Sequence, residues 1–284
     1  MNKSGTLYVV ATPIGNRADM GARAVDVLKS VACIAAEDTR HSAVLLRHFN
    51  ITTPMLALHE HNERTAVAAL LRRLQEGEDI ALISDAGTPL ISDPGFNFVR
   101  QAHESAIRVV PIPGASALIA ALSAAGLPTD RFIFEGFLPA RAAARRQRLE
   151  SLIAEPRTVI FYEAPHRLLD TLSDMVELYG AERLTVLARE LTKTFETLYR
   201  APLGELLEFV RSDANQQRGE IVLLLHGADA PAADVLPEAA ARTAELLAAE
   251  LPIKRAAALA AAISGARKNL IYDYLIKRGK APAV

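Results

Sequence analysis

Acidic and basic residues gather in two short segments that each follow an apolar run of the sequence. Glu37, Asp38 and Arg40 lie in "VACIAAEDTRH", and Glu190 and Lys193 lie in "LTVLARELTKTFE". A carboxylate beside a cation can take up a proton from a hydroxyl group or stabilise charge that develops on it. Charged pairs on loops are also common as solvated surface, so the neighbouring loops must decide whether these segments form a site.

A long polar loop follows another apolar run. The segment "SDAGTPLISDPG", Ser84–Gly95, leaves the run Ile80–Ile83 with two aspartates, two prolines and two glycines. Connections in compact domains usually take about two to six residues. The length therefore indicates either a long structural connection or a loop that is shaped around a ligand.

Four loops carry glycine, proline or charged residues at the ends of predicted strands. In an open α/β sheet, ligands bind at the carboxyl ends of the strands. Gly114 is placed to let a ligand approach the N-terminus of the next helix. Such residues are common in these loops, but four loops together favour a nucleotide-like ligand, although neither G-x-G-x-x-G nor a P-loop is present. The four segments are "TPIGN" (12–16), "AEDTRH" (36–41), "SDAGTP" (84–89) and "PIPGAS" (111–116).

Short apolar runs alternate with helical patterns along most of the chain, which predicts an α/β fold. Several strands of the first set are apolar throughout, as in a mostly parallel sheet that helices cover on both faces. Leu168–Tyr179 carries one apolar stripe and is followed by Gly180, which predicts a helix. The predicted strands are "TLYVVAT", "ACIAAE", "PMLAL", "IALIS", "IRVVPI", "FIFEGF", "TVIFYEA", "LTVLARE", "ETLYRA" and "EIVLLLHG".

The sequence predicts three parts. Residues 1–118 form an N-terminal α/β domain and residues 119–228 a second one, because "SAAGLPTDR" interrupts the pattern between the two sets of strands. The segment "GADAPAADVLP" reads as a linker. Residues 236–284 form a helical tail, with helices expected at Glu238–Leu251, Ile253–Ser264 and Ala266–Arg278.

Composition bounds the class of protein. The chain has 284 residues, half of them apolar, and a net charge of −1, which fits a globular protein rather than a disordered one. Its single cysteine excludes an intrachain disulfide, and no Cys/His cluster has metal-ligand spacing. No apolar run is long enough for a signal peptide or a membrane span. We therefore expect a cytoplasmic protein without a metal site or a membrane contact.

Two basic stretches are candidates for binding RNA, whose phosphates supply much of the affinity. "PARAAARRQR" contains Arg141, Arg145, Arg146 and Arg148 with no acid before Glu150. In the tail, a helix, a Ser-Gly turn and a second helix have helix-turn-helix spacing. The alternative for the tail is a small alanine-rich helical pack that serves dimerisation. Its basic residues are Lys254, Arg255, Arg267, Lys268, Lys277, Arg278 and Lys280.

Six motifs, in this order, resemble those of one protein family. "LYVVATPIGN", "AAEDTRH", "SDAGTPLISDPG", "FYEAPHRL", "RELTKTFE" and "GEIVLLL" are similar to the ribosomal RNA small subunit methyltransferase I family, a ribose 2′-O-methyltransferase branch of the tetrapyrrole methylases. The resemblance implies two α/β domains with S-adenosyl-L-methionine in the cleft between them, usually in a homodimer. It also implies 2′-O-methylation of a cytidine of 16S rRNA in the decoding centre of the small ribosomal subunit.

The resemblance assigns cofactor-binding residues to the strand-end loops. Asp85 to Thr88 takes the place of the Gly-Asp-Pro turn of the tetrapyrrole enzymes, so the long loop is expected to form one wall of the cofactor site. Glu163 falls where those enzymes use an apolar contact, and a helix cap is the alternative role for this residue. The full set is Pro13, Gly15, Asp85, Ala86, Gly87, Thr88, Gly114, Ser116, Ala117, Glu163 and Gly219.

Methyl transfer to a ribose hydroxyl is an in-line displacement that depends mainly on positioning. Because a 2′-hydroxyl is a poor nucleophile, a base or a stabilising cation helps. Our catalytic candidates are Asp38, Glu37, Arg40, Lys193 and Glu190, with Asp38 as proton acceptor or hydroxyl orienter and Arg40 and Lys193 beside phosphate or developing charge. The alternative is that Glu37, Asp38 and Arg40 form an ion-pair network that braces the loop.

Two other functions compete with this one. A methyltransferase acting on a tetrapyrrole such as a corrin precursor would share the cofactor loops but would need neither basic stretch. A non-enzymatic nucleic-acid-binding protein would use the tail and would leave the four strand-end loops without a role. Binding of S-adenosylmethionine separates the last function from the other two.

Overall fold

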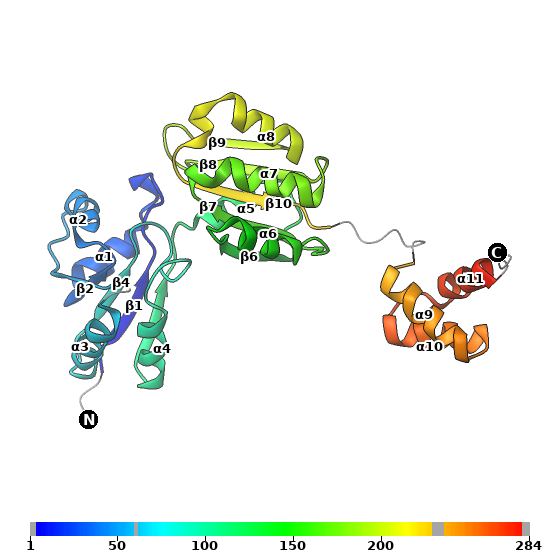
Figure 1. The fold of residues 1–284 in the computed structure, drawn as a ribbon. Coiled ribbons are helices and arrows are strands. Elements are labelled where there is room, and N and C mark those ends of the chain that lie inside the picture. Colours follow the sequence, from blue (N-terminus) through cyan, green and yellow to red (C-terminus); the bar gives the residue numbers. More distant parts are fainter. Residues whose placement is uncertain (1–3, 60–61, 229–235, 280–284) are drawn as a thin grey trace. The chain divides into compact units, whose positions relative to one another are not determined.

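The predicted alternation of strands and helices is present, and each predicted strand forms with its ends within two residues of the prediction. The computed structural model describes residues 4–59, 62–228 and 236–279 (Figure 1). It divides into two compact units, residues 1–227 and 228–284. Within these described residues, the first unit holds two five-stranded sheets and the second holds three helices, which confirms the predicted α/β fold with a helical tail.

The first sheet is parallel throughout, with the strand order β3-β2-β4-β1-β5. Every residue of β2 and β4 is buried, because α1 and α2 pack on one face and α3 and α4 on the other. The carboxyl ends of the strands therefore share one edge. The elements are β1 (Thr6–Val10), α1 (Ala22–Ser30), β2 (Cys33–Ala36), α2 (Thr39–His48), β3 (Met55–Ala57), α3 (Glu63–Gln75), β4 (Ile80–Ile83), α4 (Phe96–Glu104) and β5 (Arg108–Ile112).

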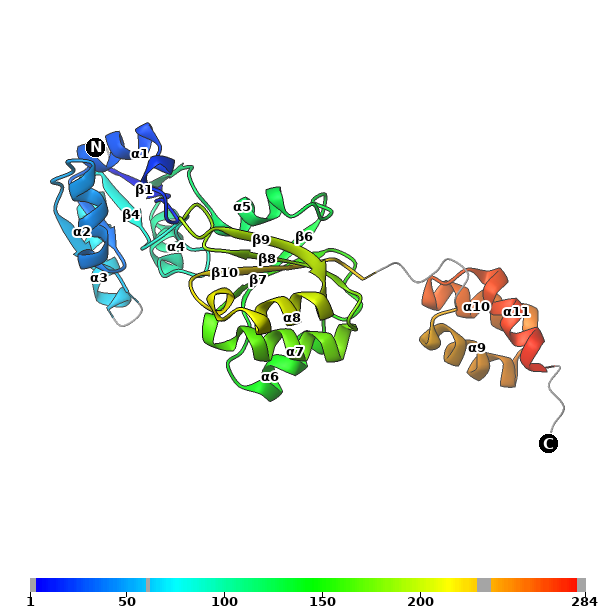
Figure 2. The same ribbon diagram turned by 90° about the horizontal axis from the view of Figure 1, so that it is seen from above.

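The second sheet has the order β6-β7-β10-β8-β9, and β6 and β7 are its one parallel pair of neighbours in the described residues. Helices α6, α7 and α8 pack on one face and α5 packs on the other (Figure 2). The last strand, β10, lies between β7 and β8, a long-range pairing that the alternation of strands and helices does not encode. The elements are α5 (Ala117–Ala124), β6 (Phe132–Phe137), α6 (Ala142–Glu150), β7 (Thr158–Glu163), α7 (Leu168–Tyr179), β8 (Leu184–Arg189), β9 (Thr197–Pro202), α8 (Leu203–Ser212) and β10 (Ile221–Leu225).

In the described residues of the first unit, three short 3₁₀ helices lie in loops. They are Arg17–Asp19, Pro165–Arg167 and Ala214–Gln217. The predicted domain boundary at residue 118 falls in α5, whose Leu118, Ala121 and Leu122 pack on the second sheet. The division of the chain at that residue stays a prediction.

The tail forms three helices close to the predicted ranges. They are α9 (Glu238–Glu250), α10 (Ile253–Ser264) and α11 (Lys268–Gly279). Small side chains let the helices approach closely, since Ala244, Ala256, Ala257 and Ala260 form most of the core. Gly265 ends α10 in the left-handed conformation that favours glycine. Most of the predicted linker (229–235) and Lys280 lie outside the described residues.

No helix in the described part of the chain is long and apolar enough to cross a membrane.

Candidate active site

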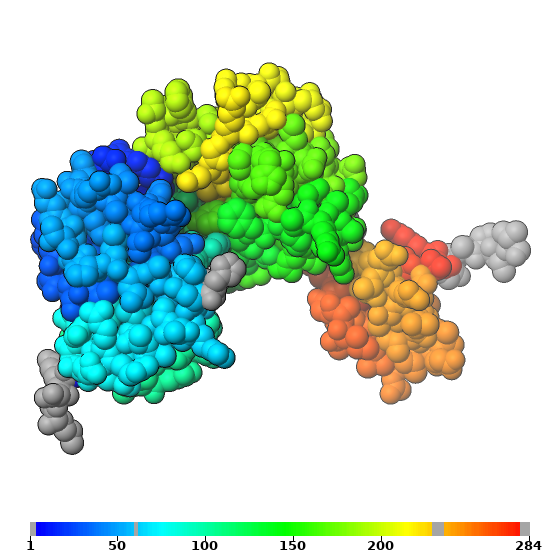
Figure 3. Space-filling model, turned by 60° about the vertical axis from the view of Figure 1, so that its left-hand side comes forward, coloured from blue at the N-terminus to red at the C-terminus, as the bar shows by residue number. Residues whose placement is uncertain are grey.

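A cavity of about 400 Å³ lies in the first unit, beside the loops at the carboxyl edge of the first sheet. Its size falls in the usual range of ligand pockets. Figure 3 shows the hollow in the surface where the blue segments meet the green and yellow ones. Residues from both sheets line it: Ile14, Ala86, Gly87, Thr88, Ile91, Ser92, Asp93, Ser116, Ala117, Phe137, Tyr162, Glu163, Ala164, Pro165, Ala188, Leu191, Gly219, Glu220, Ile221 and Val222.

The loops after β1, β4 and β5 are tied to one another by hydrogen bonds. The backbone N–H of Thr12 donates to the carbonyl of Gly87 at 2.8 Å, and the N–H of Gly87 donates to the carbonyl of Thr12 at 3.1 Å. The hydroxyl of Thr88 donates to the carbonyl of Ala115 at 3.0 Å. Three predicted strand-end loops therefore form one wall rather than three independent turns.

Two of the predicted glycines are required by space at this wall. A methyl group at Gly114 would lie 2.9 Å from the Cβ of Ala11, at the end of β1. Gly87 has a φ of +80°, and a methyl group there would lie 3.2 Å from a side-chain carbon of Ile14. Glycine is thus the residue that lets the loops close onto each other.

The second half of the long loop has an unusual backbone. Leu90 and Ser92 have φ values of +72° and +69°, in a region that side chains disfavour. Gly95 has a φ of +120°, and a methyl group there would lie 2.9 Å from a side-chain carbon of Leu82. Strained backbone of this kind is typical of functional sites. Ala86–Thr88 and Ile91–Asp93 of this loop line the cavity, which favours a loop shaped around a ligand over a purely structural connection.

Two ionisable groups of the cavity have shifted pKa values. Burial raises the pKa of Asp93; a hydrogen bond from Ser84 opposes this shift and the carboxylate of Asp85 adds to it. Burial also raises the pKa of the Tyr162 phenol, opposed by a backbone hydrogen bond from Leu118 and reinforced by the charges of Asp93 and Glu220. The cavity therefore holds a carboxylate in partly desolvated surroundings beside a phenol that keeps its proton at neutral pH.

An aromatic group closes the cavity on the side of β6. The strand register shifts between Phe134 and Gly136, and Gly136 has a φ of +66°, as at a β-bulge. Phe137, directly after the bulge, lines the cavity, and its ring packs edge-on against Tyr162 at 5.7 Å between centroids. A methyl group at Gly136 would lie 3.4 Å from the Ser92 hydroxyl, so the bulge also passes close to the strained loop.

The loop after β8 also contacts the first of the strand-end loops. The backbone N–H of Asn16 donates to the Thr192 hydroxyl at 3.1 Å, and the Lys193 side chain occupies the space beside Gly15. Nζ of Lys193 lies 2.8 Å from Oε1 of Glu190 and 3.1 Å from Oε2 of Glu220. Burial opposes the charge of Lys193, but the hydrogen bonds that its ammonium group donates to these two carboxylates outweigh burial and raise the pKa of Lys193.

Gly219 completes this wall of the cavity. Its φ is +84°, and a methyl group there would lie 2.4 Å from the carboxyl carbon of Glu190. Oε1 of Glu190 also accepts the backbone N–H of Glu220 at 2.9 Å. The predicted catalytic pair Glu190 and Lys193 thus stands behind the lining residues Leu191, Gly219 and Glu220.

Comparison with known proteins covers nearly the whole chain. A model of the family described as Tetrapyrrole (Corrin/Porphyrin) Methylases matches residues 6–207, and one described as the RsmI C-terminal HTH domain matches residues 234–279. The ribosomal RNA small subunit methyltransferase I of Pseudomonas aeruginosa is 63% identical over 97% of this chain and 98% of its own length. The protein of the same name from Escherichia coli O157:H7 is 57% identical over 98% of this chain and 96% of its own length. The chain belongs to the ribosomal RNA small subunit methyltransferase I family.

Solved structures agree on the fold of the first unit of this methyltransferase. A cobalt precorrin-4 methyltransferase aligns with a TM-score of 0.60 at 16% identity, over 78% of this chain and 94% of that one. A uroporphyrin-III C-methyltransferase from Thermus thermophilus, complexed with S-adenyl homocysteine, aligns with a TM-score of 0.53 at 18% identity, over 78% and 97%. At these identities the likeness shows the fold alone.

The predicted cofactor residues of the methyltransferase divide into two groups. Ala86, Gly87, Thr88, Ser116, Ala117, Glu163 and Gly219 line the cavity, whereas Pro13, Gly15, Asp85 and Gly114 stand behind its walls. Asp85 accepts the backbone N–H of Asp38 at 3.1 Å and so links the second and fourth strand-end loops. Gly114 and Gly15 provide the space for close packing noted above.

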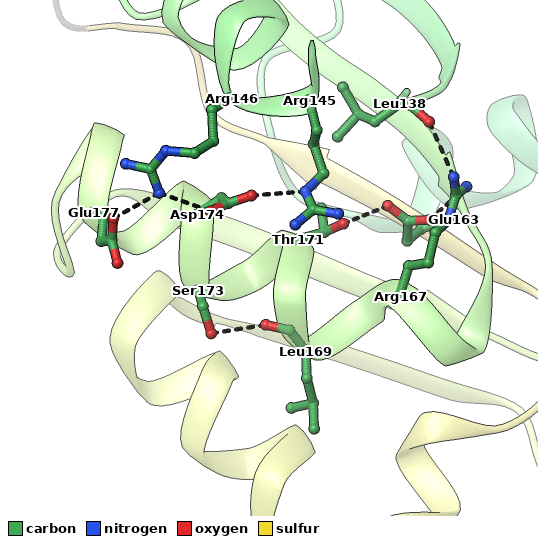
Figure 4. A network of polar contacts seen from close by, with 10 residues as sticks. All are labelled: Leu138, Arg145, Arg146, Glu163, Arg167, Leu169, Thr171, Ser173, Asp174 and Glu177. Atoms are coloured by element: carbon green, nitrogen blue, oxygen red, sulfur yellow. Dashed lines mark hydrogen bonds and ion pairs between the residues drawn. The ribbon is translucent and has the colours of Figure 1, made fainter. Parts of the chain in front are cut away.

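Glu163 has a structural role that differs from the helix cap considered as its alternative, because no side chain in the described residues caps either Pro165–Arg167 or α7. Its side chain is fully buried and turned toward α7, where it accepts the Thr171 hydroxyl at 2.6 Å and pairs with Arg167 at 3.0 Å (Figure 4). It also accepts the backbone N–H of Ala164 at 2.7 Å. The Glu163 carboxylate is thus engaged with the protein although the residue lines the cavity, and its assignment to the cofactor site stays a prediction.

The predicted catalytic group around Asp38 forms a helix cap. Oδ1 of Asp38 accepts the backbone N–H of Arg40 at 2.8 Å at the start of α2, and Oδ2 lies 3.3 Å from Nη2 of Arg40. The hydrogen bonds from Arg40 lower the pKa of Asp38. Neither Asp38 nor Glu37 nor Arg40 lines the cavity, so the structure favours the alternative that Asp38 and Arg40 brace the loop.

The arginine-rich stretch of α6 is paired with acids from elsewhere in the chain. Arg145 is 5% exposed, and its Nε donates to Asp174 at 2.7 Å, so the prediction that it contacts RNA is wrong (Figure 4). Arg146 pairs with Asp174 at 2.8 Å and with Glu177 at 2.6 Å (Figure 4). Arg148 pairs with Glu135 of β6 at 2.6 Å, whereas Arg141 is exposed at the start of α6.

The tail keeps its basic residues at the surface. Lys254 and Arg255 are exposed in the first turn of α10, and Arg267 and Lys268 are exposed at the start of α11. Arg278 instead pairs with Glu245 of α9 at 2.9 Å. Lys277 is exposed near the end of α11, so exposed basic side chains lie at the beginnings of α10 and α11 and at the end of α11.

Several lining residues were not singled out from the sequence. Asp93 and Ser92 lie inside the quoted motif "SDAGTPLISDPG", and Tyr162 lies inside "FYEAPHRL". The motifs that contain these residues were recognised in the sequence. The sequence did not show which of their positions face the cavity, because this depends on the bend of the loop and on the bulge in β6. Within the described ranges 4–59, 62–228 and 236–279, no group of three or more His, Cys, Asp and Glu side chains is arranged to hold a metal ion.

Proposed function

We propose that this chain transfers a methyl group from S-adenosyl-L-methionine to the ribose 2′-oxygen of a cytidine in 16S rRNA, in the decoding centre of the small ribosomal subunit. The observation that carries the proposal is the 63% identity with a protein named ribosomal RNA small subunit methyltransferase I, over nearly the full length of both chains. That similarity includes the cavity and the helical tail together.

The residues of the cavity fit a cationic nucleoside. Small residues (Ala86, Gly87 and Ala117) leave room for a flat base and a ribose and present backbone groups to them. The carboxylate of Glu220, which lines the cavity, complements the positive charges of S-adenosylmethionine. When bound, this cofactor supplies an electrophilic methyl group. The loops of the chain hold the acceptor oxygen in line with that group and exclude water.

The tail supports an RNA substrate rather than a tetrapyrrole. Lys254, Arg255 and Lys268 are exposed on helices that match a helix-turn-helix family model. A small macrocycle would not need such a surface, whereas an rRNA backbone gains affinity from it. We also infer a homodimer in the cytoplasm, where ribosomes are assembled, with 16S rRNA or the small subunit as partner.

One set of assays distinguishes these functions. Titration calorimetry with S-adenosylmethionine tests the cavity, and incubation with labelled cofactor compares small ribosomal subunits with a corrin precursor as acceptor. Transfer to the subunit supports the proposal. Transfer to the precursor alone would favour the tetrapyrrole enzyme, and absence of cofactor binding would favour a non-enzymatic RNA-binding protein.

A further inference from the structure

Asp93 is a carboxylate of the cavity for which the established family membership gives no role. It is half-buried, lines the cavity, and lies near enough to Tyr162 for its charge to act on the phenol. Neighbouring cavity-lining residues include the apolar Ile91. A carboxylate in such surroundings is poorly solvated and is therefore more basic than one on the surface.

The backbone around Asp93 is built to hold it in this position. The left-handed residues Leu90 and Ser92 precede it, Pro94 follows, and Gly95 packs against Leu82 of β4. Ser92 approaches Gly136 at the bulge of β6, so both sheets restrain the loop. Strained backbone persists only where its surroundings enforce it. The conformation of residues 90–95 therefore fixes the position of Asp93, which lies between Ser92 and Gly95.

The other aspartates near these loops are already engaged. Asp38 accepts two backbone N–H groups of α2 and pairs with Arg40, and Asp85 accepts the backbone N–H of Asp38. Hydrogen bonds to a carboxylate favour its charged form and make it a weaker base. Glu220 pairs with Lys193, and Glu163 is turned away toward Arg167 and Thr171.

We propose that Asp93 is the proton acceptor for the ribose 2′-hydroxyl, with Tyr162 beside it as a hydroxyl-positioning residue. This inference rests on the proposed function. During transfer the 2′-oxygen forms a bond to the methyl carbon, the sulfur–carbon bond breaks with its electron pair remaining on sulfur, and the hydroxyl proton passes to an oxygen of Asp93. The neutral carboxylic acid then returns its proton to water after the methylated nucleotide leaves.

The groups around Asp93 define how its ionisation enters the reaction. Burial and the negative charge of Asp85 disfavour its charged form, whereas the Ser84 hydroxyl favours it. Tyr162 and Glu220 line the same cavity. Glu163 also lines it, but its carboxylate is engaged with Thr171 and Arg167. A base of this kind has a pKa closer to neutrality than a surface aspartate, which increases its capacity to accept a proton.

The test compares wild-type protein with Asp93→Asn, Asp93→Glu and the control Glu104→Gln, which removes an exposed carboxylate of α4. The turnover rate on small ribosomal subunits is measured across pH, and the dissociation constant for S-adenosylmethionine is measured by calorimetry. We expect Asp93→Asn to lower kcat by about 100-fold or more. Its cofactor affinity should stay close to wild type, and the acidic limb of the wild-type pH profile should disappear. Asp93→Glu should recover part of the rate, and Glu104→Gln should behave as wild type.

Three outcomes would overturn the assignment. A kcat of Asp93→Asn within about threefold of wild type, with the acidic limb intact, would show that another group accepts the proton. A loss of cofactor affinity that accounts for the whole loss of rate would make Asp93 a cofactor ligand. A wild-type protein that binds S-adenosylmethionine but methylates no ribose would contradict the proposed function and, with it, the role of Asp93. The first two outcomes would contradict only the role of Asp93.

Discussion

At the scale of single residues, the same side chain has different chemistry at different strand ends. Asp38 and Asp93 both belong to loops at the carboxyl edge of the first sheet, yet the pKa of Asp38 is lowered by hydrogen bonds from Arg40 and that of Asp93 is raised by burial. The first aspartate is suited to hold a helix N-terminus and the second to accept a proton.

Replacing Asp38 with asparagine should reduce methylation only slightly. Asparagine caps helices about as well as aspartate, so α2 should keep its start, while the ion pair with Arg40 is lost. We expect the turnover rate to fall by less than about tenfold, measured with labelled cofactor on small ribosomal subunits. A loss of about 100-fold or more without loss of folding would restore Asp38 as the base.

Replacing Asp93 with asparagine should raise the thermal midpoint of the protein at neutral pH. Because the pKa of Asp93 is raised in the folded protein, the folded state binds the proton more tightly than the unfolded chain, and the ionised group lowers stability above its unfolded pKa. Thermal unfolding of both proteins measures the gain, which should shrink as the pH falls toward about 4, where the unfolded group becomes protonated. A lower midpoint for the variant at neutral pH would mean that the charge stabilises the fold.

The sequence could predict the motif that contains Asp93 but not the role of this residue. Its surroundings come from Tyr162 and the bulge at Gly136, which lie on strands of the second sheet. The same reason explains why the sequence could predict the motif that contains Glu163 but not the orientation of its carboxylate, which is turned to Thr171 and Arg167. The orientation of a side chain at a strand end depends on the element packed against it, and local sequence does not specify that element.

At the scale of elements, glycines decide how closely the loops of the cavity approach. Gly219 and Gly180 have the same φ of +84°, but a methyl group at Gly219 would meet Glu190 whereas one at Gly180 would meet nothing within 4 Å. The two glycines share this positive φ, and the space around them differs.

Replacing Gly219 with alanine should weaken cofactor binding more than replacing Gly180. Each substitution should cost about 1–3 kcal/mol of unfolding free energy for the left-handed backbone. Alanine at position 219 must also displace Glu190, which holds the loop after β8 through Lys193. We expect calorimetry to show the dissociation constant for S-adenosylmethionine raised about tenfold or more in Gly219→Ala, and near the wild-type value in Gly180→Ala. Equal effects would show that strain alone matters.

The arginines of α6 should separate by function when they are replaced one at a time. Removing Arg145 leaves Asp174 buried with Arg146 as its remaining partner, so Arg145→Ala should lower the free energy of unfolding by about 3 kcal/mol in urea. Arg141 is exposed at the start of α6, and Arg141→Ala should change stability by less than about 0.5 kcal/mol. An Arg145→Ala protein as stable as wild type would contradict the role of the buried pair.

The elements themselves could be predicted well, and their pairing only in part. The strands of both sheets were recognised as apolar runs, and α7 from its stripe and Gly180. The parallel direction of the strands in the first sheet follows from their burial between helices on both faces. The central position of β10 in the second sheet does not, because it joins residues more than one element apart and leaves no periodic signal in the sequence. The acids that pair with α6 were missed for the same reason.

At the scale of the whole molecule, the proposed cofactor site lies in the first unit and the basic helical tail lies in the second. Each unit has its own core: two layered sheets in one, and an alanine-rich pack of three helices in the other. Mutations in the tail should therefore change the affinity for RNA without changing cofactor binding in the first unit.

Reversing the charge of the tail should weaken RNA binding and leave cofactor binding unchanged. Lys254→Glu, Arg255→Glu and Lys268→Glu together remove exposed phosphate contacts from α10 and α11. We expect the affinity for 16S rRNA to fall and the dependence of affinity on salt to become shallower, because fewer counterions are released. Filter binding at several salt concentrations measures both. An unchanged salt dependence would favour a tail that serves dimerisation.

The most direct test of the central claim is the identity of the methylated nucleoside. Purified small ribosomal subunits that lack the modification are incubated with the wild-type protein and labelled S-adenosylmethionine, and the rRNA is digested and separated into nucleosides. We expect the label to appear in 2′-O-methylcytidine and to be lost in the Asp93→Asn variant. Label in a base-methylated nucleoside, or in no nucleoside although the protein binds the cofactor, would contradict the claim.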